Sequence, residues 1–368
     1  MISLATVGPT VGRRNAFDYS RRMVAHFYIS LAIVSTCSIL AAQPEEGPRA
    51  QYNRGTEYWY GSGVPQDYVE AANWFRKAAE RGFAEAQYRL AQMMAIGQGI
   101  RQDNTEAANW YRKAAEQGVV GAQFNLGTMY VFGQGVAKDY AEAAKWFRNA
   151  ADQGYVEAQY NLGVSYRDGQ GVAQDFHEAL TWFAKAADRG YPAAQFTFGL
   201  MYSDGQGVAP DLAKAVTWFR KSADQDYPPA EFNMGVLYAA GMGVPRDPEQ
   251  AVEWYRKAAE SGLPQAQDAL KSVADTGLPS AQHVLGMTWE YGWGGMKNEP
   301  EAVYWYRKAA EQGYPAAEYD LGRMLADGRG VPKNGAEAEA WFRRAAEKGI
   351  REAQQRLATS GAVHPLIK

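Results

Sequence analysis

The chain has 368 residues with nearly balanced charge: 38 Lys and Arg stand against 41 Asp and Glu, for a formal net charge of -3 at pH 7. Hydrophobic residues make up 46%, enough for a large core, so the composition excludes wholesale disorder. The charge balance argues against a nucleic-acid-binding protein, which would show a basic excess or stripe. The single cysteine, Cys37, excludes an intrachain disulfide framework and a cysteine-based structural zinc site.

The N-terminal residues 1–42 resemble a secretory signal. Arg21 and Arg22 precede an apolar run over residues 27–40, which is shorter than the roughly 20 apolar residues of a membrane span. We therefore predict that residues 1–42 form a signal peptide or an N-terminal anchor and that the protein is exported. Residues 43–49, rich in Pro and acid, are predicted to be a short linker.

Two features of this segment leave alternatives open. Cys37 is a possible lipid-attachment site, although residues 34–37 match a bacterial lipobox poorly. Met23 is an alternative start to Met1, but a chain that began there would lose the basic residues before the apolar run. Contact with a membrane is expected only through this segment, if it stays uncleaved or is lipidated.

Residues 50–357 form an array of repeats. Tryptophan recurs every 36 residues, and after one gap of 51 residues the series resumes: Trp74, Trp110, Trp146, Trp182, Trp218, Trp254, then Trp305 and Trp341. Such a period predicts an all-α solenoid of about eight helix pairs. Residues 358–368 are left as a C-terminal tail.

Each unit is predicted to contain two helices. In the first, Ala122, Leu126 and Tyr130 of the third unit fall on one stripe at 100° per residue, and this stripe should face the core. A glycine recurs inside this helix, as at Gly127, although it costs about 1 kcal/mol relative to Ala. We expect close helix–helix approach at that position. A Gly-x-Gly connector follows in every unit; without a Gly-Lys-Ser/Thr sequence after it, it is interpreted as a turn and not as a phosphate-binding loop.

The second helix begins after an Asp or Asn, with Glu or Gln three residues later in seven of eight units, as in Asp139 and Glu142. This spacing predicts a capping box, in which two free N–H groups are satisfied reciprocally. The helix carries Trp-Phe or Trp-Tyr and paired alanines, and it ends at a glycine that Asp226 replaces once. These acids are therefore interpreted as caps and not as catalytic carboxylates.

The recurring pattern AxxxLGxxYxxGxGVxxDxxxAxxWFRKAAExG resembles the Sel1-like repeat, a relative of the tetratricopeptide repeat. The resemblance covers residues 50–357 and implies a right-handed α/α superhelix whose first helices line a concave surface. Members of the family mostly act as adaptors for partner proteins, often at bacterial envelopes, which would place this chain in the periplasm or anchored to the inner membrane. Cysteine-stapled members linked to β-lactam binding are a poor guide, because these repeats contain no cysteine.

The register slips by 15 residues near residues 263–280, where Gly262-Leu-Pro is echoed at Gly277-Leu-Pro. A short additional helix from Pro264 to Asp275 is predicted, which would interrupt the alternation of helices. The alternatives are a tolerated insertion and a functional hinge.

Catalytic and metal-binding motifs are not found. The histidines His26, His177, His283 and His364 stand in unrelated contexts, and no HExxH, GxSxG, SxxK, Walker or CxxC arrangement occurs. His283 is interpreted as a packing substitution for the aromatic residue of other repeats. We predict no enzyme, no metal site and no cofactor.

What remains is a concave groove for a protein or peptide partner, predicted on the side of the first helices opposite the inward Leu stripe. The alternative for the aromatic residues two positions after the opening Ala is packing between repeats. The candidate contact residues run from an aromatic end to an acidic middle, which suggests a partner with a basic segment. They are Trp59, Tyr60, Tyr88, Ile96, Phe124, Phe132, Tyr160, Arg167, Asp168, Asp204, Tyr291 and Asp327.

The function predicted from the sequence is therefore that of an exported scaffold or adaptor without enzymatic activity, binding no nucleic acid. The alternatives are a periplasmic regulator of a membrane sensor and an envelope enzyme or β-lactam-binding protein.

Overall fold

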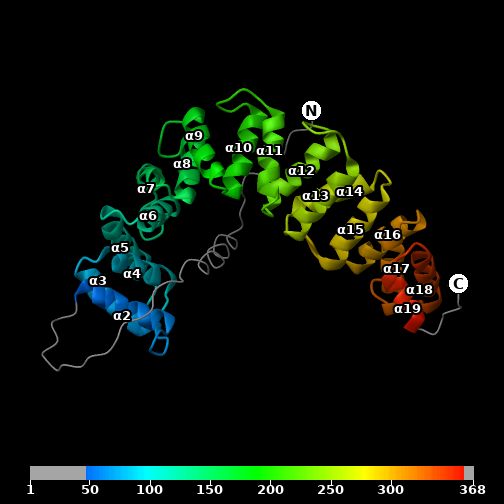
Figure 1. Cartoon of the computed structure of the whole chain (residues 1–368), viewed down its shortest axis with the longest axis horizontal. Helices are drawn as coiled ribbons and strands as arrows, with labels where there is room; N and C mark the ends of the chain where they lie inside the picture. The colour runs from blue at the N-terminus through cyan, green and yellow to red at the C-terminus, as the bar shows by residue number, and fades with distance from the viewer. Residues whose placement is uncertain (1–46, 360–368) are drawn as a thin grey trace. The chain divides into compact units, whose positions relative to one another are not determined.

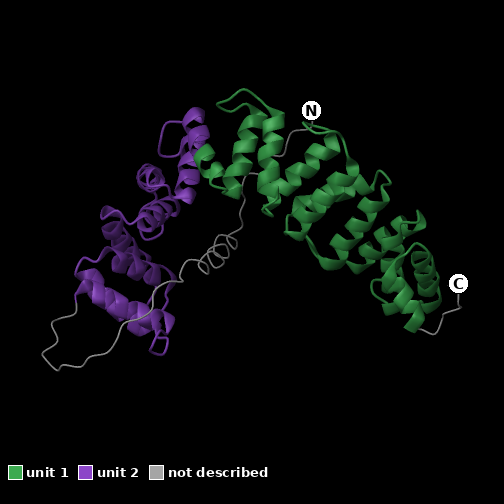
Figure 2. Ribbon diagram, viewed as in Figure 1, with its two compact units in different colours: residues 1–4, 183–368 green, residues 5–182 purple. Residues whose placement is uncertain are grey.

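The computed structural model describes residues 47–359, and this part of the chain folds as helices without a β-strand (Figure 1). It divides into two compact units, whose described parts are residues 47–182 and 183–359 (Figure 2). The predicted all-α array of helix pairs is confirmed. The predicted signal peptide or anchor, His26, Cys37, His364 and nearly all of the tail lie outside the described residues. None of the helices in residues 47–359 is both long and apolar enough to span a bilayer.

Each repeat consists of a first and a second helix. The first helices are α2 (Pro48–Tyr60), α4 (Ala84–Ile96), α6 (Val120–Phe132), α8 (Val156–Asp168), α10 (Pro192–Asp204), α12 (Pro228–Ala240), α15 (Pro279–Tyr291) and α17 (Pro315–Asp327). The second helices are α3 (Tyr68–Glu80), α5 (Asn104–Glu116), α7 (Tyr140–Asp152), α9 (Phe176–Asp188), α11 (Leu212–Ala223), α13 (Pro248–Glu260), α16 (Glu299–Glu311) and α18 (Gly335–Glu347). Helix α14 (Pro264–Ala274) stands between two repeats, and α19 (Arg351–Thr359) ends the described chain.

The predicted caps of the second helices are confirmed, but the reciprocal half of the capping box is wrong. Asp139 accepts hydrogen bonds from the backbone N–H groups of Ala141 and Glu142. Its own backbone N–H donates to the carbonyl of Tyr130 at 3.0 Å and not to a Glu side chain. The same bond, reaching nine residues back, recurs at every cap in residues 47–359. Each cap therefore fastens the second helix to the end of the first.

The glycine inside the first helix marks the close approach that we expected. A Cβ atom on Gly127 would lie 2.8 Å from the ring of Phe147 on α7, and one on Gly55 would lie 2.7 Å from the ring of Phe75 on α3. Only hydrogen fits at these contacts, so the local loss of helix propensity is offset by packing of an aromatic ring against the helix backbone.

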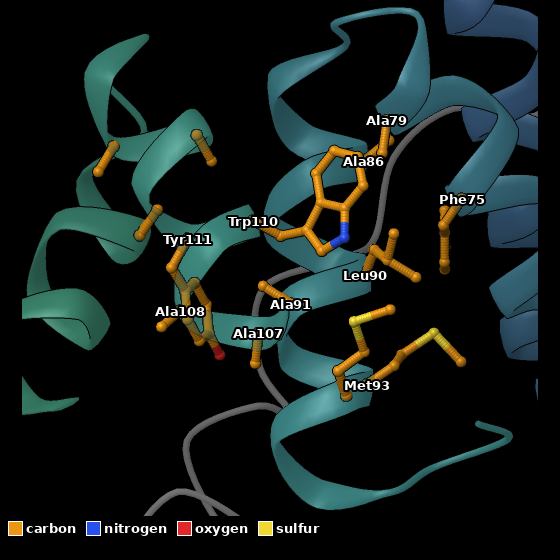
Figure 3. Packing of buried hydrophobic residues seen from close by; sticks show 14 of the residues in the cluster. Phe75, Ala79, Ala86, Leu90, Ala91, Met93, Ala107, Ala108, Trp110 and Tyr111 are labelled. Atoms are coloured by element: carbon orange, nitrogen blue, oxygen red, sulfur yellow. The ribbon is translucent and has the colours of Figure 1, made fainter. Parts of the chain in front are cut away.

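Small and large residues alternate across the core of each unit. In residues 47–182, Leu90 and Met93 of α4 are fully buried between Phe75 of α3 and Trp110 and Tyr111 of α5 (Figure 3). The alanines that pair along the second helices are buried as well, and they bring neighbouring helices close together. From α4 onward, every first helix thus packs between a preceding and a following helix, which is how a repeat that cannot bury its apolar face alone becomes stable.

The Gly-x-Gly turns stack on the preceding repeat. Both glycines have a positive φ, as at Gly133 (67°) and Gly135 (69°), a conformation that favours residues without a Cβ. A Cβ on Gly135 would run into the backbone carbonyl of Asn104 at the start of α5. Equivalent contacts join Gly99 to Tyr68. Successive turns therefore form a continuous edge within each unit.

The predicted additional helix is confirmed as α14. It packs against both α13 and α15, and α13 also contacts α15. Its C-terminal end takes the place of a second helix, because Gln282 of α15 donates to the carbonyl of Ala274 just as Gln123 donates to that of Ala115. Its N-terminal end lies under the next turn, where Gly294 faces the carbonyl of Leu263. One helix thus fills the position that normally belongs to the second helix of a repeat.

Candidate functional site

The last residue of each first helix forms an exposed row along the edge of the turns. In residues 47–182, Tyr60, Ile96 and Phe132 are 51%, 52% and 67% exposed, and Asp168 follows at the same position. We call these four residues the helix-end row. Because each is followed by a left-handed glycine and the turns stack, the row is continuous within this unit. The sequence predicted all four as partner contacts, and the structure places them at one position of four consecutive repeats; as partner contacts they stay predictions.

Three other predicted residues of this unit lie deeper. The rings of Tyr88 and Tyr111 have centroids 5.9 Å apart, and Phe124 lies 5.1 Å from Tyr155. Tyr160 takes the equivalent position on α8 and is half-buried. Much of each ring is therefore engaged between helices, and as partner contacts these three residues stay predictions.

Trp59 and Arg167 also have partners within the chain. The ring of Trp59 meets those of Tyr68 and Phe75, with centroids 5.1 and 6.4 Å apart. The guanidinium of Arg167 donates two hydrogen bonds to the carboxylate of Asp168, at 2.7 and 2.9 Å. The acidic middle that the sequence suggested is thus partly neutralised within this unit.

In residues 183–359 the corresponding helix ends carry Asp204, Tyr291 and Asp327, all exposed. Partial burial raises the pKa of Asp204 above its ordinary value. Tyr291 stacks on Trp293 in the following turn, with centroids 5.1 Å apart and the planes inclined by 28°. Burial and the nearby Glu290 carboxylate raise the pKa of Tyr291.

A buried charge network lies under this turn, and the sequence reasoning missed it. Glu290 is fully buried; its carboxylate accepts hydrogen bonds from Tyr306 (2.7 Å), Arg323 (2.6 Å) and Arg329 (2.9 Å). Burial by itself would raise the pKa of Glu290, but the bonds from Arg323 and Tyr306 and the charge of Arg329 outweigh it and hold this pKa below the ordinary value. Burial also raises the pKa of Tyr306, as do Glu290 and Asp320.

This network continues to His283, whose Nε2 lies 2.9 Å from Asp320, a residue also bound by Arg323. The ring of His283 packs between Tyr306 and Tyr314, so its interpretation as a packing substitution is confirmed. The sequence signal for the network was a glutamate at position 290, where other repeats carry Trp, Ala, Val, Arg or Ser.

A ladder of buried glutamines joins consecutive repeats. Gln123 donates to the carbonyl of Ala115 at 3.1 Å and accepts from Gln153 at 2.8 Å. Glutamate replaces the glutamine of the ladder in two repeats, at Glu231 and Glu318. Glu318 accepts from Lys348 (2.7 Å) and Arg344 (3.0 Å).

Glu231, the other glutamate of the ladder, faces Ser261, and its Oε2 has no hydrogen-bond partner. Burial is the main cause that raises the pKa of Glu231 to about 6, with Asp226 and Glu260 adding to the shift and Ser261 and Lys257 opposing it.

The chemistry of these groups is that of binding and packing. Within residues 47–359 no three His, Cys, Asp or Glu side chains gather in a way that would hold a metal ion. The carboxylates that start the second helices accept backbone N–H groups, as Asp139 does. An all-α repeat solenoid with an exposed row at its helix ends belongs to the class of proteins that present a surface to a partner.

The chain belongs to the Sel1 repeat family. The sequence profile of the Sel1 repeat matches residues 48–83, 84–119, 120–155, 156–191, 192–227, 228–263, 279–314 and 315–350. Only α14 and its connection interrupt the series. Sel1 repeat proteins are generally scaffolds without enzymatic activity, and their fold is typically used for protein–protein interaction.

Two solved structures are similar to this chain. A Sel1 repeat protein from Oxalobacter formigenes is 30% identical, with a TM-score of 0.53, and the match covers 89% of this chain and 98% of that one. A protective antigen present in uropathogenic Escherichia coli strains is 32% identical, with a TM-score of 0.49, over 86% of this chain and 80% of that one. No curated protein matched the chain.

Proposed function

We propose that this protein is an exported scaffold that binds a protein or peptide partner through the exposed ends of its first helices. Tyr60, Ile96 and Phe132 carry the proposal. They are large apolar side chains, each at least half exposed, at one position of three consecutive repeats. Other repeats hold Asp, Ala or Tyr at this position, so the fold does not require an apolar residue there. Contiguous exposed apolar side chains on a soluble surface typically mark a site of interaction.

The helix-end row offers a partner a rigid surface. Each of its side chains stands on the last turn of a helix that ends at a left-handed glycine, and the helices after α2 are packed on both sides. Binding to such a surface orders few additional side chains, which lowers the entropic cost of association. At its far end the row reaches the Arg167–Asp168 pair, whose charges favour a partner with polar groups there.

The row is tested by photo-crosslinking in the native cell. A photoreactive phenylalanine analogue at position 132 should yield a defined crosslinked partner, and the triple change Tyr60→Ser, Ile96→Ser and Phe132→Ser should abolish that partner's binding. Glu116 is the control, because it is exposed at the C-terminal end of the second helix α5, whereas it is the N-terminal end of a second helix that the cap fastens to the end of a first helix. Equal crosslinking from positions 132 and 116 would refute the assignment. Trp59 is left unchanged, since its contacts with Tyr68 and Phe75 are part of the packing.

Export is a separate part of the proposal and rests on the apolar run at residues 27–40 behind Arg21 and Arg22. Fractionation of cells that express the full chain should place it in the envelope or periplasm. Deletion of residues 1–42 should retain it in the cytoplasm. A protein that stays in the cytoplasm with residues 1–42 intact would contradict export without affecting the binding surface.

A further inference from the structure

The turn after α15 carries an aromatic pair that the repeat fold does not need. Tyr291 is 53% exposed and stacks on Trp293, and Met296 in the same turn is 85% exposed. Residues that take the place of Trp293 in other repeats are Ser62, Gln98, Gln134, Gln170, Gln206, Met242 and Arg329. The turn closes with each of these side chains, so packing does not explain a Trp at this position.

Elsewhere the chain covers its Trp rings with its own cations. Lys nitrogens lie 3.8 to 4.9 Å from the ring centroids of the second-helix tryptophans in the pairs Lys77–Trp74, Lys113–Trp110, Lys221–Trp218, Lys257–Trp254 and Lys308–Trp305. Trp59 and Trp289 lie against core clusters instead. The charges of Arg323 and Arg329 act on Tyr291, but both arginines are bound to Glu290. Within residues 47–359 no basic side chain lies over the ring of Tyr291 or Trp293. Their stacked rings present an aromatic face that attracts a cation and is not occupied by one from the described chain.

Negative charge lies beside this pair. Arg329 bonds to Glu290, the neighbour of Tyr291, so the side chain of a residue in the turn after α17 reaches the end of α15, and Asp327 precedes Arg329 by two residues. The two arginines of the network are already bound to carboxylates. Asp327 is exposed at a helix C-terminus, where the helix dipole disfavours an anion. The Asp327 carboxylate therefore does not stabilise its own helix, whereas it would stabilise a bound cation.

We propose that Tyr291, Trp293 and Asp327 together bind a Lys or Arg side chain from a basic segment of the partner. The cation lies against the stacked rings and pairs with the Asp327 carboxylate. This inference rests on the proposed function, because it names the chemistry of the partner, but it concerns residues 183–359 and not the helix-end row. The bonds of Glu290 with Arg323 and Arg329 join α15 to α17 and its following turn, next to these side chains in the sequence.

The test is a selection of random dodecapeptides displayed on phage against the full chain, with removal of peptides that also bind the Trp293→Gln variant. The surviving peptides should be enriched in Arg or Lys. Synthetic copies should lose about five- to thirtyfold in affinity on Trp293→Gln or Asp327→Asn, which corresponds to losing a partly desolvated cation–π contact or its counter-charge. Tyr304→Gln is the matched control: Tyr304 is 50% exposed, but Lys308 already lies over its ring at 4.8 Å.

Three outcomes would overturn the inference: acidic or purely apolar peptides survive, no peptide survives, or Asp327→Asn binds the basic peptides unchanged. The proposed function is tested separately, because crosslinking from position 132 reports on the other unit. If that crosslinking succeeds and the selection fails, only the basic-side-chain site is lost. If the selection succeeds and the crosslinking fails, the helix-end row is not the binding surface.

Discussion

Replacing Glu231 by Gln should stabilise the protein at neutral pH and leave it unchanged in mild acid. Glu231 is 1% exposed, and its Oε2 has no hydrogen-bond partner. At the same position in most other repeats a glutamine donates to a backbone carbonyl and accepts from the next glutamine of the ladder, as Gln195 does. The substitution therefore removes a buried charge and restores one donor.

The size of the effect follows from the pKa of Glu231, which rises from 4.5 to about 6 on folding, chiefly through burial. A difference of one and a half pKa units corresponds to about 2 kcal/mol. Because the folded-state pKa is the higher one, the folded protein binds the proton more tightly than the unfolded chain. The contribution of Glu231 to the free energy of unfolding is therefore highest below pH 4.5 and falls as the pH rises through 6. The Glu231→Gln variant lacks this pH dependence, so its free energy of unfolding at pH 8 should exceed that of the wild type by about 2 kcal/mol.

The assay is urea unfolding of the full chain at pH 4.5 and pH 8, followed by tryptophan fluorescence, with amide hydrogen exchange of α12 as the local measure. Glu318→Gln is the control, because Glu318 has Lys348 and Arg344 as partners and its neutralisation should destabilise the protein. If Glu231→Gln had the same effect at both pH values, or none at pH 8, the assignment of a buried, uncompensated carboxylate would be refuted.

Three further substitutions test the packing. Gly127→Ala should destabilise the protein by about 1–2 kcal/mol in urea unfolding, because the added Cβ would lie 2.8 Å from the ring of Phe147. Ala91 is the counterpart of Gly127 on α4, and Ala91→Gly should cost about 1 kcal/mol. Asp139→Ala should cost about 1 kcal/mol through loss of the cap, with Asp139→Asn as the near-neutral comparison. Glu290→Ala should cost about 3 kcal/mol of stability and lower the thermal midpoint, because two arginines lose their buried partner. An unchanged midpoint would show that the network contributes nothing to stability.

The repeat period in the sequence predicted most of the fold. Trp at 36-residue intervals, the capping Asp and the helix-ending glycines are local signals with a local physical cause, so they predicted each helix pair. The 15-residue slip in this register predicted the additional helix α14. The reciprocal capping box was wrong because the N–H of Asp139 donates to the carbonyl of Tyr130 instead. That acceptor belongs to the preceding helix, and its position depends on how the two helices pack.

The sequence alone determined that this protein is a helical array without a recognisable catalytic motif, since periodicity and composition act on each repeat in the same way. It also identified Tyr60, Ile96 and Phe132 as departures from the pattern. Tertiary structure decided which departures face solvent and which meet one another. Glu290 and Arg323 are 33 residues apart in sequence and 2.6 Å apart in space, and whether a carboxylate is paired or isolated depends on such distances and on exclusion of water.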